Sequence, residues 1–150
     1  MTGGAGFIGS HLVERLLADG KSVTVVDDLS TGTLDNLRAA SADPRLRVIE
    51  SRVSTCRELA QLVAGAESIY HLAAAVGVDL VVRSPIHVLQ TNLHETEVLL
   101  EAAAGQRVPV VSTLHTRHRR IGWRVIACPL VWSGPATAGA GAASQRRGWL

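Results

Sequence analysis

The chain has 150 residues, of which 47% are hydrophobic and 19% charged, and its formal net charge is +2 at pH 7. This length supports one domain with its own core, and the composition is that of a globular protein. The two cysteines, Cys56 and Cys128, form no C-x-x-C pair, which argues against a disulfide scaffold or a zinc site. Because no signal-peptide pattern and no membrane-spanning apolar run is visible, we expect a cytoplasmic protein.

The first predicted element is a glycine-rich turn that opens a helix. In the stretch 2–10, Gly3, Gly6 and Gly9 have the spacing G-x-x-G-x-x-G, and apolar residues continue at helical period as far as Leu17. Glycines let the chain turn tightly and let a pyrophosphate approach the amides at the positive end of the new helix. The pattern predicts a phosphate-binding turn, although a glycine triplet alone also fits an ordinary turn.

A short buried strand is expected next, at 22–27, after the helix has ended at Asp19-Gly20. It finishes on Asp27, which lies 18 residues after Gly9. An acidic residue ~20 residues after such a turn binds the ribose of a dinucleotide. The alternative role for Asp27 is that of a solvated acid in a loop.

The charge at the end of this strand bears on the choice of cofactor. A 2′-phosphate at ~4 Å from Asp27 would be repelled by about 4 kcal/mol at an effective dielectric constant of 20. Asp28 adds to the repulsion, and the sequence has no Lys or Arg between Lys21 and Arg38. We therefore predict that the site takes NAD rather than NADP.

The strand that leads into the glycine turn is missing from the sequence. Such a strand normally has ~5 residues and lies at the centre of the sheet. Here only Met1 precedes Thr2. Two explanations are open: translation starts upstream, or the sheet has a truncated first strand and a slot between its neighbours.

Strand and helix patterns alternate along the rest of the chain. Strands are expected at 46–50, 68–72 and 108–112, a short helix at 34–37, and a second helix after the capping box Thr55-Cys-Arg-Glu58. A long helix should begin at Ser84-Pro85. Its residues expected to face inward are Ile86, Leu89, Leu93 and Leu100. The alternation predicts an α/β fold, a Rossmann-like doubly wound parallel sheet with helices on both faces, whose ligands bind beyond the carboxyl ends of the strands.

Charge divides the chain into two parts. Residues 1–113 carry nine basic and 13 acidic side chains, whereas residues 114–150 carry six arginines and no acid. We therefore predict a partial NAD-binding Rossmann domain at 1–113 and a divergent basic tail at 114–150.

Five stretches, 2–10, 26–32, 71–74, 92–96 and 99–103, together resemble the extended short-chain dehydrogenase/reductases. Within that group they are most similar to the NAD-dependent epimerase/dehydratase family, which includes UDP-glucose 4-epimerases and UDP-glucuronate decarboxylases. The resemblance implies a tightly held NAD that oxidises a carbon of a nucleotide sugar and is then regenerated. It also implies a homodimer for the full-length members.

The resemblance implies a cofactor-binding role for fourteen residues in separate segments. They are Gly3, Gly6, Phe7, Ile8, Gly9, Asp27, Asp28, Thr31, Gly32, Leu72, Ala73, Ala74, Asn92 and Ser112. The turn would hold the pyrophosphate and Asp27 the adenosine ribose. Asn92 and Ser112 would lie near the nicotinamide half, but a satisfied polar residue at the end of an element is an equal alternative for both.

Two positions depart from the family pattern. Members carry Gly-Asp after the strand at 46–50, with the Asp reaching the adenine, where this chain has Ser51 and Arg52. Since Arg cannot accept a hydrogen bond from the adenine amino group, we expect NAD affinity to fall by ~1–3 kcal/mol. Glu95 stands where the family has the glycine of its Asn-x-x-Gly-Thr pattern.

The catalytic pair of the family, a Tyr with a Lys four residues later, is absent. In that pair the ammonium lowers the pKa of the phenol. The one tyrosine and the one lysine, Tyr70 and Lys21, lie in or beside strands. Ser112 and His115 have no orienting acid after them, which argues against a hydrolase. We assign no catalytic residue, and whether the chain is an enzyme stays open.

Past Thr113 the resemblance ends, and residues 121–135 are only faintly similar to the next strand of the family. Either a segment with the Tyr and Lys is deleted between 114 and 120, or the reading frame shifts near 114. A third possibility is that the chain is a fragment or a pseudogene product of a longer protein. We expect 136–147 to be disordered. The alternative function is a non-enzymatic module whose tail arginines contact nucleic acid. His115 and His118 alone make a poor metal site.

Overall fold

The structure is a computed structural model that describes residues 1–75, 82–106 and 108–112. The elements in chain order are α1 (Phe7–Ala18), β1 (Val23–Asp27), the 3-10 helix η1 (Leu34–Leu37), β2 (Leu46–Glu50), α2 (Leu59–Ala64), β3 (Ile69–His71), α4 (Pro85–Ala103) and β4 (Val110–Ser112). The basic tail predicted at 114–150, including its arginines, its histidines and the strand remnant, lies outside the described residues. The nucleic-acid hypothesis therefore stays a prediction.

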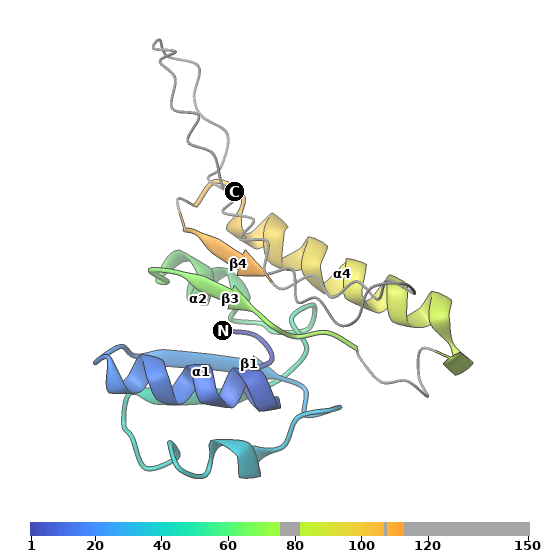
Figure 1. The fold of residues 1–150 in the computed structure, drawn as a ribbon. Coiled ribbons are helices and arrows are strands. Elements are labelled where there is room, and N and C mark those ends of the chain that lie inside the picture. Colours follow the sequence, from blue (N-terminus) through green and yellow to red (C-terminus); the bar gives the residue numbers. More distant parts are fainter. Residues whose placement is uncertain (76–81, 107, 113–150) are drawn as a thin grey trace, which may run out of the picture.

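All strand pairs are parallel, and residues 1–3 join them into one sheet. β1 pairs with β2 and β3 pairs with β4. Between these pairs, Thr2 forms parallel bridges to Val26 and to His71. The order across the sheet is therefore β2, β1, residues 1–3, β3, β4 (Figure 1). This confirms the predicted Rossmann-like parallel sheet.

A cavity separates β1 from β3 on the side of Met1. A cavity of about 700 Å³ lies beside Met1, between Thr24 of β1 and Tyr70 of β3, with α2 residues in its wall. The Met1 amine donates a hydrogen bond to the carbonyl oxygen of Thr24 at 2.7 Å. Burial lowers the pKa of this amine from 8.0 to about 6. Residues 1–3 thus bridge β1 and β3 at the carboxyl end of the sheet, where the glycine turn begins.

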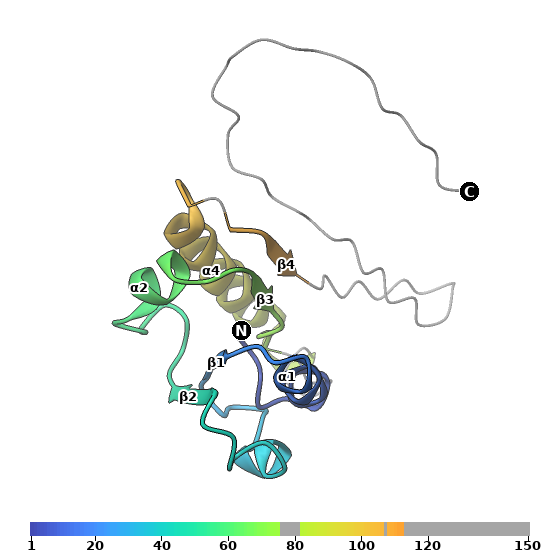
Figure 2. The ribbon, with the colours of Figure 1, turned by 90° about the vertical axis from the view of Figure 1, so that its left-hand side faces the viewer.

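Helices cover both faces of the sheet, as predicted. Figure 2 shows α1 on one side and α2 with α4 on the other. One hydrophobic cluster packs α1 against β1 and η1, around Val13, Val25 and Leu37. A second cluster packs α2 and α4 against β3 and β4, around Val63 and Leu99. The two clusters hold the two strand pairs separately.

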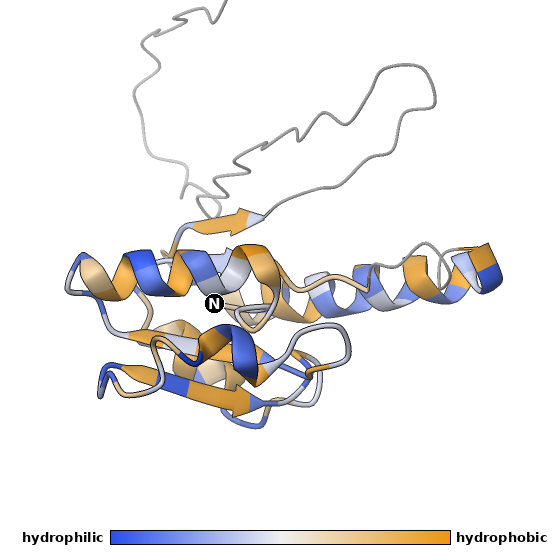
Figure 3. Cartoon of the chain, turned by 60° about the horizontal axis from the view of Figure 1, so that its bottom comes forward, coloured by the Kyte–Doolittle hydropathy of each residue, from blue (hydrophilic) through white to orange (hydrophobic). Residues whose placement is uncertain are grey.

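The inward face predicted for α4 is wrong. Ile86, Leu89 and Leu93 are 71%, 60% and 61% exposed, and Leu100 is 38% exposed. The buried residues of α4 are instead Val88, Leu99 and Ala103. The first half of the helix extends past the described strands, where its apolar face is uncovered by the described part of the chain (Figures 1 and 3). Periodicity finds the apolar faces of a helix but does not say which one meets a neighbour.

The capping box predicted before α2 does not form. Thr55 lies in a turn, where its amide donates to the Arg52 carbonyl, and the helix begins only at Leu59. Glu58 occupies the cap position without a side-chain cap bond. Its carboxylate instead pairs with Arg47 of β2 at 2.8 Å. The Glu58 side chain thus pairs with a residue of β2 instead of capping its own helix.

Two properties of the described residues concern membranes and metals. Among residues 1–75, 82–106 and 108–112, no helix has the length and apolarity needed to cross a membrane. In the same residues, no three or more His, Cys, Asp or Glu side chains gather as they would around a metal ion.

The core of the second cluster gives a direct test of the fold. Leu99→Ala removes a side chain that is 1% exposed, so we expect a loss of ~2–5 kcal/mol in the free energy of unfolding. Leu93→Ala makes the same chemical change on the same helix at a position that is 61% exposed, and should change stability by less than ~0.5 kcal/mol. Denaturant unfolding of both variants measures the difference, and equal losses would contradict the described packing of α4.

Candidate functional site

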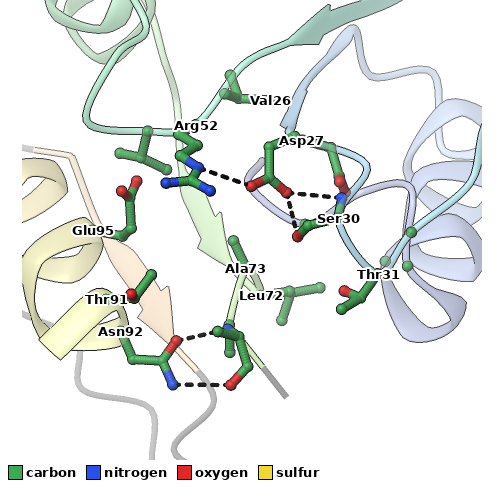
Figure 4. A pocket seen from close by; sticks show the side chains of 18 of the residues that line it. Val26, Asp27, Ser30, Thr31, Arg52, Leu72, Ala73, Thr91, Asn92 and Glu95 are labelled. Carbon is green, nitrogen blue, oxygen red and sulfur yellow. Dashed lines mark hydrogen bonds and ion pairs between the residues drawn. The ribbon is translucent and has the colours of Figure 1, made fainter. Parts of the chain in front are cut away.

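A pocket of about 440 Å³ lies at the carboxyl ends of β1, β2 and β3. Its walls come from the glycine turn, the loops after these three strands and one side of α4 (Figure 4). The structure brings thirteen of the fourteen predicted cofactor-binding residues to this pocket, and Ser112 is the exception. Nine residues that were not predicted to bind the cofactor also line it, and three of them are the departures from the family pattern: Val26, Ser30, Ser51, Arg52, Val53, Ala75, His87, Thr91 and Glu95.

The glycine turn has the shape that an anion site requires. Gly3 has φ +71°, and a Cβ there would overlap the backbone of Leu72 and Ala73. A Cβ on Gly9 would overlap the carbonyl oxygen of Gly3. Gly6 caps α1, so the amides of the next three residues belong to the first helical turn and have no intrahelical acceptor. These amides, at the positive end of the helix dipole, border the pocket and suit a phosphate.

Asp27 is buried at the end of β1 and holds two backbone segments in place. Its Oδ2 accepts a hydrogen bond from the Ala5 amide at 2.8 Å, and its Oδ1 accepts one from the Leu29 amide at 3.0 Å. Leu29 itself has φ +56°, a strained value for a non-glycine residue. A carboxylate has about four acceptor positions, so the Asp27 side chain can still accept hydrogen bonds from ribose hydroxyls. The spacing rule found Asp27 but not its role in shaping the turn.

Asp28 is paired with a cation that the local sequence does not contain. Arg52 Nε donates to Asp28 Oδ2 at 3.2 Å, and the Ser30 hydroxyl donates to Oδ1 at 2.6 Å. Partial burial raises the pKa of Asp28, but the hydrogen bonds from Ser30 and Arg52 outweigh this effect and lower it below the usual value. The repulsion that we expected from Asp28 toward a 2′-phosphate is therefore partly neutralised. The sequence did not indicate this ion pair because Arg52 lies 24 residues after Asp28, beyond β2.

Glu95 joins α4 to the loop that follows β2. Its two carboxylate oxygens accept hydrogen bonds from the Ser54 hydroxyl at 2.6 Å and the Ser54 amide at 2.9 Å. Glycine at position 95 could not make this contact. The departure from the family pattern thus has a structural consequence, because it fixes the loop that carries Ser51 and Arg52.

A chain of hydrogen bonds behind the pocket ties residues 1–3 to β3 and α4. The Thr96 hydroxyl donates to the Asn92 carbonyl at 2.7 Å, which leaves it to accept from His71 Nε2 at 3.0 Å. His71 Nδ1 then accepts from the Thr2 hydroxyl at 2.7 Å, and the Ala73 amide donates to Thr2 Oγ1. This order assigns neutral His71 with its proton on Nε2. Burial lowers the pKa of His71, against an opposing contribution from Glu95.

The other polar residues considered from the sequence differ in their contacts and in their distance from the pocket. Asn92 pairs both side-chain atoms with the backbone of Ala75, at 2.6 and 3.3 Å, so its amide is structurally satisfied while it borders the pocket. Ser112 ends β4 away from the pocket. Tyr70 lies within β3, and Lys21 pairs with Glu67 at 2.7 Å. Neither Tyr70 nor Lys21 lines the pocket.

A parallel sheet whose order reverses at residues 1–3, with a glycine turn and an acidic residue at that edge, defines a Rossmann-type α/β protein. Comparison with known sequences gives the family. Residues 1–116 match the GDP-mannose 4,6 dehydratase family, and the chain belongs to it. The resemblance to the nucleotide-sugar epimerases and dehydratases is thereby confirmed.

Similar proteins act on nucleotide sugars, and their names agree with this family. The chain is 41% identical over 111 residues to UDP-glucose 4-epimerase of Mycolicibacterium smegmatis, covering 71% of this chain and 35% of that protein. It is 36% identical over 116 residues to UDP-glucuronic acid decarboxylase 6 of Arabidopsis thaliana, covering 75% and 32%. The chain thus spans about a third of the length of these curated relatives.

Solved structures agree with the fold. The dTDP-glucose 4,6-dehydratase DesIV of Streptomyces venezuelae, solved with NAD and TYD bound, matches with a TM-score of 0.67 and 38% identity, over 73% of this chain and 37% of that one. UDP-glucose 4-epimerase of Thermotoga maritima, solved with UDP-glucose, matches with a TM-score of 0.64 and 34% identity, over 74% and 35%.

The hydrogen-bond chain through His71 predicts a pH dependence of stability. The folded protein favours neutral His71, so its pKa is lowered when folded and rises toward about 6.5 on unfolding. The unfolded state therefore binds more protons, and this contribution to stability is complete above about pH 6.5 and is lost as pH falls through the folded pKa. His71→Gln, which does not titrate, should lose less stability than the wild type between pH 7 and pH 5.

The control for this prediction is His11→Gln, which removes an exposed histidine of α1. Thermal melts across the pH range compare the three proteins. We expect the His11 variant to follow the wild type, and identical pH slopes for the wild type and the His71 variant would contradict the assigned neutral state.

Proposed function

We propose that residues 1–113 form the NAD-binding domain of a nucleotide-sugar epimerase/dehydratase-type oxidoreductase. The proposal rests on the pocket. The first-turn amides of α1 and the Asp27 carboxylate border the same pocket. The NAD in DesIV and the nucleotide-sugar substrates in the names of the similar proteins support it.

The residues present fit the cofactor from one end of the pocket to the other. The glycine turn would bind the pyrophosphate, since added Cβ atoms at Gly3 and Gly9 would close the space beside its amides. Asp27 would bind the ribose, with Thr31 and Gly32 beside it, and residues 72–74 would line the path toward the second nucleotide half. When bound, NAD supplies a hydride acceptor that can oxidise a sugar carbon and return the hydride.

The preference for NAD over NADP would come from Asp27 more than from Asp28. Asp27 is buried and bonded only to backbone amides among the described residues, so its negative charge faces the ribose without a neutralising cation. Asp28 has Arg52 beside it. A 2′-phosphate would thus meet one uncompensated carboxylate instead of two.

The chain's own residues bind and orient the cofactor, while the reaction needs an acid/base group from elsewhere. The described residues bring no tyrosine and lysine together at the pocket. We propose that, in the whole protein, a segment beyond these 150 residues supplies this pair and the binding of the nucleotide sugar. A cytoplasmic location and a homodimer of the whole protein complete the proposal.

Calorimetric titration of the 150-residue chain with NAD tests the proposal. We expect binding, together with a higher melting temperature in the presence of NAD. Gly9→Ala should weaken binding by roughly tenfold or more, because the new Cβ overlaps the Gly3 carbonyl and displaces the turn.

The matched control is Gly65→Ala, where a Cβ would meet only the Gln61 carbonyl oxygen at an ordinary 3.5 Å. Its NAD affinity should equal that of the wild type, and circular dichroism should show all three proteins folded. A folded wild-type chain that neither binds millimolar NAD nor melts at a higher temperature with it would contradict the proposed function.

A further inference from the structure

Arg52 is the one permanently charged cation among the described residues that line the pocket. The carboxylates of Asp27, Asp28 and Glu95 line the same pocket. In this part of the chain the pocket is thus acidic except at the guanidinium. Figure 4 shows the Arg52 side chain extending from the loop after β2 toward the loop that carries Asp27 and Ser30. The charge of Arg52 therefore bears on which anionic groups of a ligand the pocket can take.

Backbone and side-chain contacts place Arg52 beside the end of β1. The Ser51 amide donates to the Asp27 carbonyl at 3.0 Å, which joins the end of β2 to the end of β1. Arg52 follows directly, and its Nε donates to Asp28 Oδ2 at 3.2 Å. The amide and the hydroxyl of Ser30 both donate to the other oxygen of Asp28. The ion pair therefore lies next to Asp27, the residue proposed to bind the adenosine ribose.

The ion pair uses only part of the guanidinium. In the described part of the chain, the two terminal nitrogens of Arg52 have no hydrogen-bond partner, and the side chain is 60% exposed. A guanidinium with free N–H groups suits a phosphate, which it can contact through two parallel hydrogen bonds. The loop of Arg52 is also anchored, because Glu95 of α4 accepts hydrogen bonds from the amide and the hydroxyl of Ser54. Arg52 thus has donors available for an anionic group that enters the pocket.

NAD and NADP differ at the ribose that Asp27 is proposed to bind, so this inference rests on the proposed function. NADP carries a 2′-phosphate there, and a phosphate monoester has a charge of about −1.5 to −2 at pH 7. A phosphate next to Asp27 also lies in the field of Asp28 and of Arg52. Arg52 attracts it and offsets the repulsion from Asp28, whatever the orientation of the base. Without the guanidinium, both carboxylates would repel the phosphate.

We propose that Arg52 is a specificity-determining residue that lets this pocket take NADP as well as NAD. NAD still binds more tightly, because Asp27 can accept hydrogen bonds from the ribose hydroxyls but repels a 2′-phosphate. Arg52 keeps the difference small by neutralising Asp28 and by donating to the phosphate from its terminal nitrogens. Asp27 thus favours NAD, and Arg52 moderates that preference.

Calorimetric titration of the 150-residue chain with NAD and with NADP tests this role through the ratio of the two dissociation constants. We expect the wild type to bind NADP roughly tenfold more weakly than NAD at about 0.1 M salt. Arg52→Ala should weaken NADP relative to NAD by a further factor of about three to ten, a modest change because the guanidinium is partly exposed. Arg52→Lys keeps the charge and should stay close to the wild type. Asp28→Asn removes a repelling charge and should bring NADP closer to NAD.

An electrostatic role also predicts how salt acts on these ratios. The difference between the wild type and Arg52→Ala should shrink at about 0.5 M salt, because mobile ions screen the guanidinium. A role confined to holding the loop would give the same difference at both salt concentrations. The matched control is Arg38→Ala, which removes the same charge from an exposed pair with Asp35 outside the pocket and should leave the ratio unchanged.

NAD binding without detectable NADP binding at millimolar concentration would overturn the acceptance of NADP and leave the proposed function intact. An unchanged ratio in folded Arg52→Ala, or a difference that salt does not reduce, would overturn the electrostatic role of Arg52. If Arg52→Ala does not fold, Arg52→Gln removes the same charge and gives the same measurement. If the folded wild-type chain binds neither dinucleotide, the proposed function is overturned and this inference with it.

Discussion

The structure depends on three residues that lie between β1 and β3. Thr2 donates its amide to the Tyr70 carbonyl at 2.9 Å and accepts from the Leu72 amide at 3.0 Å, while the amides of Gly3 and Val26 bond across the other side. These bonds join two strand pairs that have separate hydrophobic clusters. The Thr2 side chain adds the buried contact to His71. The glycine turn therefore begins where the strand order reverses, which is where doubly wound sheets bind their ligands.

The same short segment also fixes the position of the glycine turn. At its carboxyl end it fixes the turn, and the backbone bonds of Asp27 lock the turn to the loop after β1. Beside Met1, a cavity of about 700 Å³ lies between β1 and β3. The contacts of the turn and of Asp27 lie at the edge of the sheet that carries the pocket. The family to which the chain belongs supports NAD as the proposed ligand at this edge.

Sequence reasoning succeeded where the signal is local. Alternation located β2 at its observed bounds, and the spacing from Gly9 to Asp27 located two sides of the pocket. It failed where partners are distant: the pairs of Arg52 with Asp28 and of Glu95 with Ser54 join residues 24 and 41 apart, which no periodicity encodes. The buried face of α4 was predicted wrongly for a related reason, because the neighbours of a helix decide which of its apolar faces is buried.

The most direct test of the central claim is an NMR titration of the 15N-labelled chain with NAD. We expect the amide signals of Gly3 and of residues 7–9, together with that of Leu29, to shift as NAD is added. The amides of residues 62–68, beside the cavity between β1 and β3, should stay where they are. Shifts confined to 62–68, or none at the glycine turn at saturating NAD, would contradict the claim that this turn and Asp27 form a dinucleotide site.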